Sequence, residues 1–248
     1  MINVAVFGAA GRMGRQVCEA VDQADGLRVV ARVDLDDDPK AAVEQGATVA
    51  VDFTHPGVVM DNLEFCVRNG IHAVVGTSGF TPERLARVES WLAETSDRPV
   101  GVLVAPNFSL GAVLMMRFAA QAAPLFESVE IVELHHPDKA DAPSGTAQRT
   151  AELVAAARRE ANSAPFPDAT KHDADHHRGG TVEGVPVHSV RLRGLIAHQE
   201  VLLGAQGETL TIRHDSLDRI SFMPGVVLGV RRVAERPGLT VGLEHYLD

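Results

Sequence analysis

The chain has 248 residues, of which 45% are hydrophobic and 23% are charged, and its formal net charge is −10. This composition excludes wholesale disorder and supplies enough apolar residues for two modest domains. The negative charge argues against nucleic-acid binding as the main function. No apolar run reaches the about 20 residues of a membrane span, and the N-terminus lacks the pattern of a secretion signal. The two cysteines are too few for a disulfide framework, so we expect a cytoplasmic protein.

The first 108 residues alternate between β-branched runs and amphipathic segments. This alternation predicts a Rossmann-type, doubly wound, mostly parallel α/β sheet. Ligands bind such sheets at the carboxyl ends of the strands, so 52–56, 76–79 and 105–108 are expected to line one crevice. Strands are predicted at 2–7, 29–33, 49–53, 71–75 and 100–105, and helices at 12–24, up to Asn69, and at 83–95.

After about residue 109 the pattern changes to strands that alternate polar and apolar residues. It predicts a second, α+β domain with an open mixed sheet, one face of which is covered by helices. A polar stretch at 162–184 interrupts it, and a final helix at 224–235 is expected to return to the first domain. The predicted helices are 111–123 and 146–161, the strands 129–134, 185–192, 198–204 and 208–214, and the domains 1–108 with 219–248, and 109–218.

Three glycines follow the first strand and open the first helix. Gly8, Gly11 and Gly14 have the spacing G-x-x-G-x-x-G, where the usual dinucleotide fingerprint is G-x-G-x-x-G. Glycine lets the backbone approach a pyrophosphate, and the helix N-terminus offers it free N–H groups. Asp34 ends the next strand, where an acid binds the adenosine ribose hydroxyls. A tight turn without a ligand is the alternative, but this context favours a nicotinamide dinucleotide.

The residues after Asp34 bear on the choice of cofactor. Asp36, Asp37 and Asp38 make this region acidic, which opposes the 2′-phosphate of NADPH. NADH is therefore expected to be preferred. Arg12 in the glycine turn is either a partial compensation, which would keep NADPH in use, or a solvated surface charge.

The segment 133–146 carries the second group of candidate residues. A predicted strand ends in His135 and His136, and Lys139 follows in a short polar loop. Ser144 is expected to cap the next helix, with Gly145 and Thr146 presenting backbone N–H groups. A carboxylate bound there would gain charge-assisted hydrogen bonds. It would also lie beside His135 and His136, because histidine is a side chain that can titrate near neutral pH.

Adjacent strand residues point to opposite faces, so both histidines face one ligand only if the strand ends there. Pro137 favours such an end. One buried structural histidine beside an exposed one is the alternative. No third ligand stands at a suitable spacing, so no metal site is expected.

On these motifs the chain resembles the dihydrodipicolinate reductase family over nearly its whole length. The resemblance implies NAD(P)H-dependent reduction of 4-hydroxy-tetrahydrodipicolinate to tetrahydrodipicolinate, with loss of water, in lysine and diaminopimelate biosynthesis. The most specific block is ELHHPDKADAPSGT at 133–146. The others are GAAGRMGRQ at 8–16, DFTHP at 52–56, GTSGF at 76–80, APNFSLG at 105–111, VRLRGLIAHQEV at 190–201 and GETLTIRHDSLDR at 207–219.

The resemblance also implies a homotetramer in which the substrate-domain sheets pack together at the centre. His135 would be the general acid, and Lys139 a second proton source that contacts a substrate carboxylate. Leu35 stands where some members carry arginine, and Ser78 where threonine is common. The other implied substrate residues are His136, Ser144, Gly145 and Thr146, and the implied cofactor residues are Gly8, Gly11, Arg12, Met13, Gly14, Asp34, Phe53, Thr54, Gly76, Thr77, Ser78, Ala105, Pro106, Asn107 and Phe108.

Two other functions compete with this one. A non-catalytic dinucleotide-sensing regulator would normally carry a DNA-binding helix pair or a basic patch, and the sequence contains neither. A Rossmann reductase of another small acid, such as a semialdehyde, usually needs a nucleophilic cysteine. Cys18 and Cys66 lie in predicted helices away from strand ends.

Overall fold

The computed structural model describes residues 1–95 and 97–247, and the chain divides into two compact units. The first unit consists of Met1–Ser109 and Phe222–Asp248, and the second of Leu110–Ser221. Within the described residues no helix combines the length and the apolar character that crossing a membrane requires.

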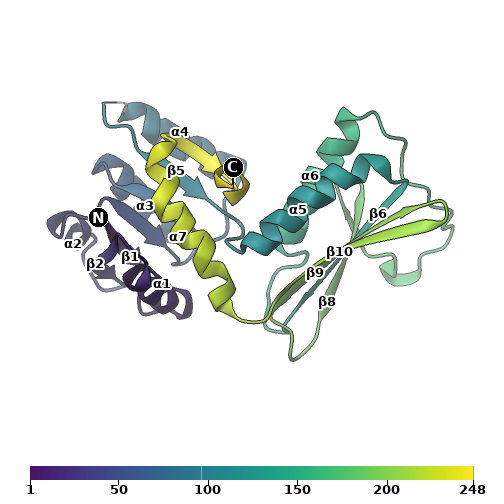
Figure 1. The fold of residues 1–248 in the computed structure, drawn as a ribbon, viewed down its shortest axis with the longest axis horizontal. Coiled ribbons are helices and arrows are strands. Elements are labelled where there is room, and N and C mark those ends of the chain that lie inside the picture. The colour runs from purple at the N-terminus through teal and green to yellow at the C-terminus, as the bar shows by residue number, and fades with distance from the viewer. Residues whose placement is uncertain (96, 248) are drawn as a thin grey trace. The chain divides into compact units, whose positions relative to one another are not determined.

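The first unit is built on a six-stranded parallel sheet flanked by helices (Figure 1), which confirms the Rossmann-type fold. The strand order is β11-β5-β4-β3-β1-β2. The strands are β1 (Ile2–Phe7), β2 (Leu27–Val33), β3 (Val49–Asp52), β4 (His72–Val75), β5 (Gly101–Val104) and β11 (Gly238–Val241), and the helices are α1 (Arg12–Gln23), α2 (Lys40–Glu44), α3 (Val59–Arg68), α4 (Pro82–Glu94) and α7 (Met223–Arg232).

The central strands of this sheet are buried on both faces, which explains why their sequences are runs of apolar residues rather than alternating ones. Helix α3 buries Val59, Leu63, Cys66 and Val67, which recur at helical spacing and join the core cluster of the sheet. Each buried valine or leucine of this set stabilises the fold by about 1.5–3 kcal/mol relative to exposure.

The chain leaves β1 toward β2 on one side and later returns to β3 on the other, so the strand order reverses between β1 and β3. The register pairs Phe7 with Asp52, Asp52 with Val75, and Val75 with Val104. The residues that follow these strands therefore lie side by side at one edge of the sheet, where ligands bind this fold.

The second unit is a five-stranded mixed sheet in the order β10-β9-β6-β8-β7, as predicted for an open mixed sheet. Strand β6 runs parallel to β8 and antiparallel to β9. Helices α5 and α6 lie together on one face (Figure 1). The elements are α5 (Leu110–Ala122), β6 (Ser128–His135), α6 (Gly145–Glu160), β7 (Gly180–Val182), β8 (Val185–Arg191), β9 (Ala197–Ala205) and β10 (Glu208–Ser216).

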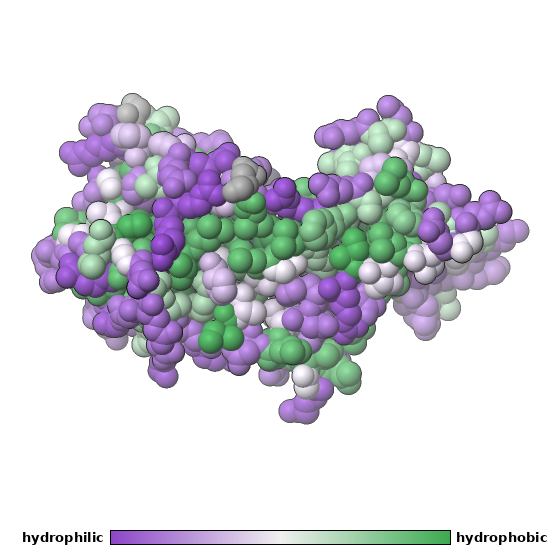
Figure 2. All heavy atoms as spheres, viewed as in Figure 1, coloured by the Kyte–Doolittle hydropathy of each residue, from purple (hydrophilic) through white to green (hydrophobic). Residues whose placement is uncertain are grey.

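Alternate residues of β6 face the helices. Val129, Ile131 and Glu133 are buried, whereas the side chains between them are half-buried on the opposite face. Figure 2 shows hydrophobic residues gathered over the turn between β8 and β9, where Leu192 is 58% exposed.

Several elements differ from the sequence predictions, among them the short helix α2, which was not predicted. The predicted helix 224–235 ends at Arg232, because residues 233–235 tighten into a 3₁₀ turn before the chain enters β11. Strands β11 and β7 were not predicted; β7 lies within the polar stretch 162–184 and is only three residues long. Short strands of this kind depend on pairing with a neighbour rather than on their own pattern.

Candidate active site

The glycine turn of the first unit brings helix α1 against strand β1. Gly8 has φ of +76°, a conformation that L side chains rarely adopt. A Cβ at Gly14 would lie 2.0 Å from the carbonyl oxygen of Gly8 and 2.7 Å from the Cα of Ala9. Both positions therefore require glycine, and the close approach leaves the N-terminus of α1 at the edge of the sheet.

Helix α1 begins with Gly11 as its N-cap, which provides no side-chain acceptor for the first-turn N–H groups. Asp34, the residue after β2, stabilises this turn. Its Oδ2 accepts a hydrogen bond from the Ala10 N–H at 2.8 Å. Arg12 is exposed and Met13 is half-buried. Backbone donors and an acid thus meet at the place where the sequence predicts a pyrophosphate and a ribose.

Asp52 joins the ends of β3 and β4. This residue is 4% exposed, and its carboxylate accepts hydrogen bonds from the Thr77 hydroxyl at 2.6 Å, the Thr54 hydroxyl at 2.7 Å and the Asn62 amide at 2.8 Å. Thr54 and Thr77 are therefore at the predicted edge, but their hydroxyls bind Asp52. Ser78, the next residue, is exposed.

Phe53, another predicted cofactor residue, is held at this edge by packing contacts. A Cβ at Gly76 would lie 2.1 Å from the ring of Phe53, so Phe53 packs directly on the backbone of the β4 end. Phe53 and Phe108 are in tilted contact, with ring centroids 5.6 Å apart. Beyond β5, Ala105 is buried, Pro106 is exposed, and the Asn107 side chain accepts the Ser109 N–H at 2.7 Å.

In the second unit, β6 ends at His135, as the position of Pro137 indicated. The Nδ1 atom of His135 lies 2.5 Å from Oε2 of Glu133. Glu133 is fully buried and also accepts two hydrogen bonds from the Arg191 guanidinium, at 3.0 and 2.8 Å. Burial by itself raises the pKa of Glu133, but the hydrogen bonds from His135 and Arg191 outweigh it and bring the pKa to about 2.

Lys139 lies in the loop after β6 with 21% of its side chain exposed. Its ammonium group forms an ion pair with Oδ1 of Asp141 at 2.7 Å. Burial opposes ionisation of Asp141, but the hydrogen bond and charge of Lys139 lower its pKa overall. The backbone carbonyl of Asp141 accepts a hydrogen bond from Arg191 Nη2 at 2.7 Å.

The start of α6 has the predicted form. Ser144 is the N-cap and accepts the Ala147 N–H at 3.2 Å. A Cβ at Gly145 would have no atom of the described residues within 4 Å, and its φ is ordinary, so neither packing nor conformation requires glycine there. The Nδ1 atom of His136 is buried and has no hydrogen-bond partner among the described residues. The site therefore offers open space above Gly145, beside Thr146, and an unused polar atom.

Sequence reasoning missed Glu133, Arg191 and Asp141. Period-two alternation places Glu133 on the same face of β6 as His135, so this residue was within reach of a pattern argument. Arg191 reaches the site because β8 pairs with β6 in a register that sets it opposite His135. That pairing joins residues far apart in the sequence, which local patterns do not indicate.

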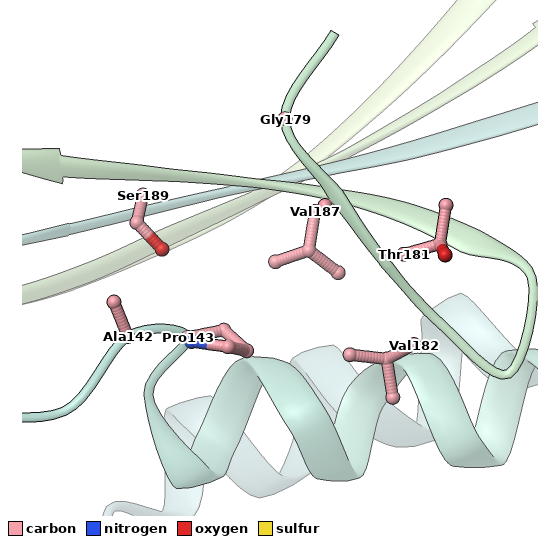
Figure 3. A pocket seen from close by; sticks show the side chains of 8 residues that line it. Ala142, Pro143, Gly179, Thr181, Val182, Val187 and Ser189 are labelled. Atoms are coloured by element: carbon pink, nitrogen blue, oxygen red, sulfur yellow. The ribbon is translucent and has the colours of Figure 1, made fainter. Parts of the chain in front are cut away.

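A pocket of about 450 Å³ lies next to the 133–146 segment, between the start of α6 and the β7–β8 hairpin (Figure 3). Ala142 and Pro143 line it from the loop, and Val187 and Ser189 from β8. None of the predicted substrate residues lines it. Across residues 1–95 and 97–247, no group of three or more metal-ligating side chains is present.

Comparison with known proteins covers both units. The family model described as dihydrodipicolinate reductase, N-terminus, matches residues 2–108, and the model of the C-terminus of the same enzyme matches residues 111–247. The 4-hydroxy-tetrahydrodipicolinate reductases of Streptomyces coelicolor and Nocardia farcinica are each 62% identical to the chain over 247 residues. These matches span 100% of this chain and 98% and 99% of the respective relatives.

Solved structures agree with this likeness. A dipicolinate-bound dihydrodipicolinate reductase from Paenisporosarcina sp. TG-14 has a TM-score of 0.84 and 36% identity, and the match covers 100% of both chains. An amine dehydrogenase from Mycobacterium smegmatis, at 13% identity and a TM-score of 0.64 over 98% of this chain and 95% of its own, shares the fold alone. Two family models and full-length relatives at this level of identity leave one conclusion: the chain belongs to the dihydrodipicolinate reductase family.

Proposed function

We propose that this chain catalyses the NAD(P)H-dependent reduction of 4-hydroxy-tetrahydrodipicolinate to tetrahydrodipicolinate, with loss of water, in lysine and diaminopimelate biosynthesis. The observation that carries the proposal is the local structure of the 133–146 segment: two ionisable side chains, His135 and Lys139, precede a capped helix N-terminus. The full-length identity to reductases of that name supports the same reaction.

The substrate is a dicarboxylate, and the second unit offers matching groups. Lys139 supplies a full positive charge, and the α6 N-terminus supplies backbone N–H groups and the positive end of the helix dipole. The open space above Gly145 admits a carboxylate oxygen, and the buried Nδ1 of His136 is a further partner. Fixing both carboxylates orients the ring and lowers the entropic cost of reaching the transition state. The proposed substrate residues are His136, Lys139, Ser144, Gly145 and Thr146.

The edge of the first unit fits a nicotinamide dinucleotide. The turn from Gly8 to Gly14 lets the backbone come close to a pyrophosphate, and Asp34 stands where an adenosine ribose would bind. When bound, the reduced cofactor supplies the hydride. We propose that NADH is preferred, because Asp34 and the exposed Asp36, Asp37 and Asp38 repel a 2′-phosphate. The proposed contacts are Gly8, Gly11, Arg12, Met13, Gly14, Asp34, Phe53, Thr54, Gly76, Thr77, Ser78, Ala105, Pro106, Asn107 and Phe108.

His135 and Lys139 are the proposed proton sources. Reduction of the ring requires a proton as well as a hydride, and a general acid contributes about 10²–10⁴-fold. Both groups must be cationic before transfer, and a bound dianion favours that state.

We also propose a homotetramer that acts in the cytoplasm. Leu192, Leu202, Leu210 and Leu217 of the second unit are 58, 36, 40 and 77% exposed, which supports burial against other copies. Cys18 and Cys66 are buried free thiols, which suits a reducing compartment.

The test follows the loss of nicotinamide absorbance when the purified chain is mixed with the condensation product of pyruvate and aspartate semialdehyde. NADH and NADPH are supplied in parallel, and turnover is expected with a higher kcat/KM for NADH. Absence of substrate-dependent oxidation with both cofactors would overturn the proposal. Tight dinucleotide binding without oxidation would instead favour the sensing regulator.

A further inference from the structure

The ion pair between Glu133 and Arg191 contacts the segment that carries the two proposed proton sources, His135 and Lys139. Glu133 of β6 accepts two hydrogen bonds from Arg191 of β8. Glu133 also contacts His135, and Arg191 also donates to the carbonyl of Asp141. We infer that Glu133 and Arg191 are positioning residues, which hold His135 and the loop of Lys139 in the geometry needed to donate a proton. This inference rests on the proposed function.

The contact between Glu133 and His135 selects one ring nitrogen. Glu133 is fully buried, and its carboxylate is held ionised by the hydrogen bonds from Arg191. An ionised carboxylate only accepts hydrogen bonds, so the Nδ1 of His135 must carry a hydrogen whether the ring is neutral or cationic. The proton that His135 can lose is therefore the one on Nε2, the nitrogen turned away from Glu133. The same logic orients catalytic histidines in other enzymes.

Arg191 is also connected to Lys139, through Asp141. Its Nη2 atom donates both to Oε1 of Glu133 at 2.8 Å and to the carbonyl of Asp141 at 2.7 Å. Asp141 in turn holds the Lys139 ammonium group at 2.7 Å. The planar guanidinium can satisfy both acceptors at once, whereas the ammonium of a lysine lacks this fixed fork. One side chain thus links the end of β8 to both proposed proton sources.

If Glu133 and Arg191 had only a structural role, replacing either residue would leave the rate of the chemical step in the folded protein unchanged. Buried ion pairs add little net stability, because the cost of removing both charges from water offsets their attraction. Glu130 provides the matched comparison within the same strand. It sits on the opposite face of β6 and also accepts from a histidine, His188 at 2.5 Å, and from an arginine, Arg178 at 2.6 Å. None of these three residues belongs to the proposed site.

The first experiment compares Glu133→Gln with Glu130→Gln. In Glu133→Gln the amide NH₂ group must face one of the two Arg191 donors, because both carboxylate oxygens accept from that guanidinium. Single-turnover stopped flow isolates the chemical step from product release. Its rate is expected to fall at least about tenfold in Glu133→Gln, with KM changed less than about threefold, and to stay within about twofold in Glu130→Gln. Equal rates in both variants and the wild type would overturn the inference.

The second experiment reads the histidine directly. Nitrogen chemical shifts of labelled wild-type protein distinguish the two neutral tautomers, and the neutral His135 ring is expected to carry its hydrogen on Nδ1. A neutral ring protonated on Nε2 would refute the assignment without any variant, even if Glu133→Gln failed to fold. Arg191→Lys keeps the charge but not the fork, and is expected to lower the single-turnover rate by at least about tenfold. A wild-type rate in Arg191→Lys would contradict the role given to the guanidinium.

These experiments separate the two proposals. If the wild type shows no substrate-dependent oxidation, the proposed function fails, whereas the tautomer of His135 still tests the geometry. If the wild type turns over and the Glu133 and Arg191 variants match it, only the positioning role fails.

Discussion

Substituting Gly14 by alanine tests whether close contact between α1 and β1 builds the cofactor edge. The added Cβ would lie 2.0 Å from the Gly8 carbonyl oxygen, 1.0 Å below the 3.0 Å limit that real Cβ atoms respect. Both nearby groups are backbone, so no rotamer change relieves the overlap and α1 must shift by about 1 Å. Such overpacking lowers the free energy of unfolding by about 1–3 kcal/mol, and we expect the upper end of that range. Losing one charge-assisted hydrogen bond to the pyrophosphate costs about a further 1.5–3 kcal/mol of binding, or at least about tenfold in Kd.

The assay uses the single tryptophan of the chain. Trp91 is 4% exposed in the core of the first unit, so its fluorescence during urea unfolding reports that unit. NADH titration gives the change in Kd. Gly57→Ala is the control, because the nearest atom to its added Cβ belongs to the His55 side chain, at 3.2 Å, rather than to the backbone. A small shift of that ring relieves the contact, so the stability of Gly57→Ala is expected to stay within about 0.5 kcal/mol of the wild type. If Gly14→Ala unfolds and binds NADH like the wild type, the reasoning about the turn is wrong.

Three further predictions concern the two sites. His135→Gln and Lys139→Ala are each expected to lower kcat by about 10²–10⁴-fold, and wild-type turnover in both would remove them from the reaction. Asp34→Asn keeps an oxygen for the Ala10 N–H but loses the charge, so the ratio of kcat/KM for NADH over NADPH should fall about tenfold; an unchanged ratio would contradict the role of the acid. The pKa of Glu133 is lowered from 4.5 to about 2 in the folded protein, so its contribution to stability is complete above pH 4.5 and is lost as the pH falls through about 2. Circular dichroism of urea unfolding should therefore show a steeper loss of stability below pH 4.5 in the wild type than in Glu133→Gln, and parallel curves would count against this assignment.

The parts of the fold that follow from local patterns were predictable. The buried runs of β3 and β5 and the spacing of Val59, Leu63 and Cys66 indicate their elements directly, because each pattern repeats with the period of one structure. Strand β11 was missed because it is short and depends on pairing with β5.

The site divides in the same way. Ser144 at the start of α6 and the glycines of the first turn are local signals, and the sequence was enough to place them. The partner of His135 was within reach of the alternation rule, but Arg191 was not, because strand register decides its position. Thr77 is a predicted cofactor residue, and local patterns did not indicate that its hydroxyl donates a hydrogen bond to the buried carboxylate of Asp52. A buried charge collects donors from several segments, and composition does not reveal which ones.

If a dicarboxylate binds through Lys139 as proposed, it meets an ammonium group that is already paired with Asp141. The ammonium group already has an anionic partner, so binding through Lys139 replaces one carboxylate with another and creates no additional pair of opposite charges. The released Asp141 side chain returns to water, where it is 59% exposed even before the exchange. Added salt weakens both the old and the new contact, so affinity should depend less on ionic strength than the number of charged groups implies. Selectivity for a doubly charged ligand would then come from its second carboxylate, for which the chain holds no internal substitute among these residues.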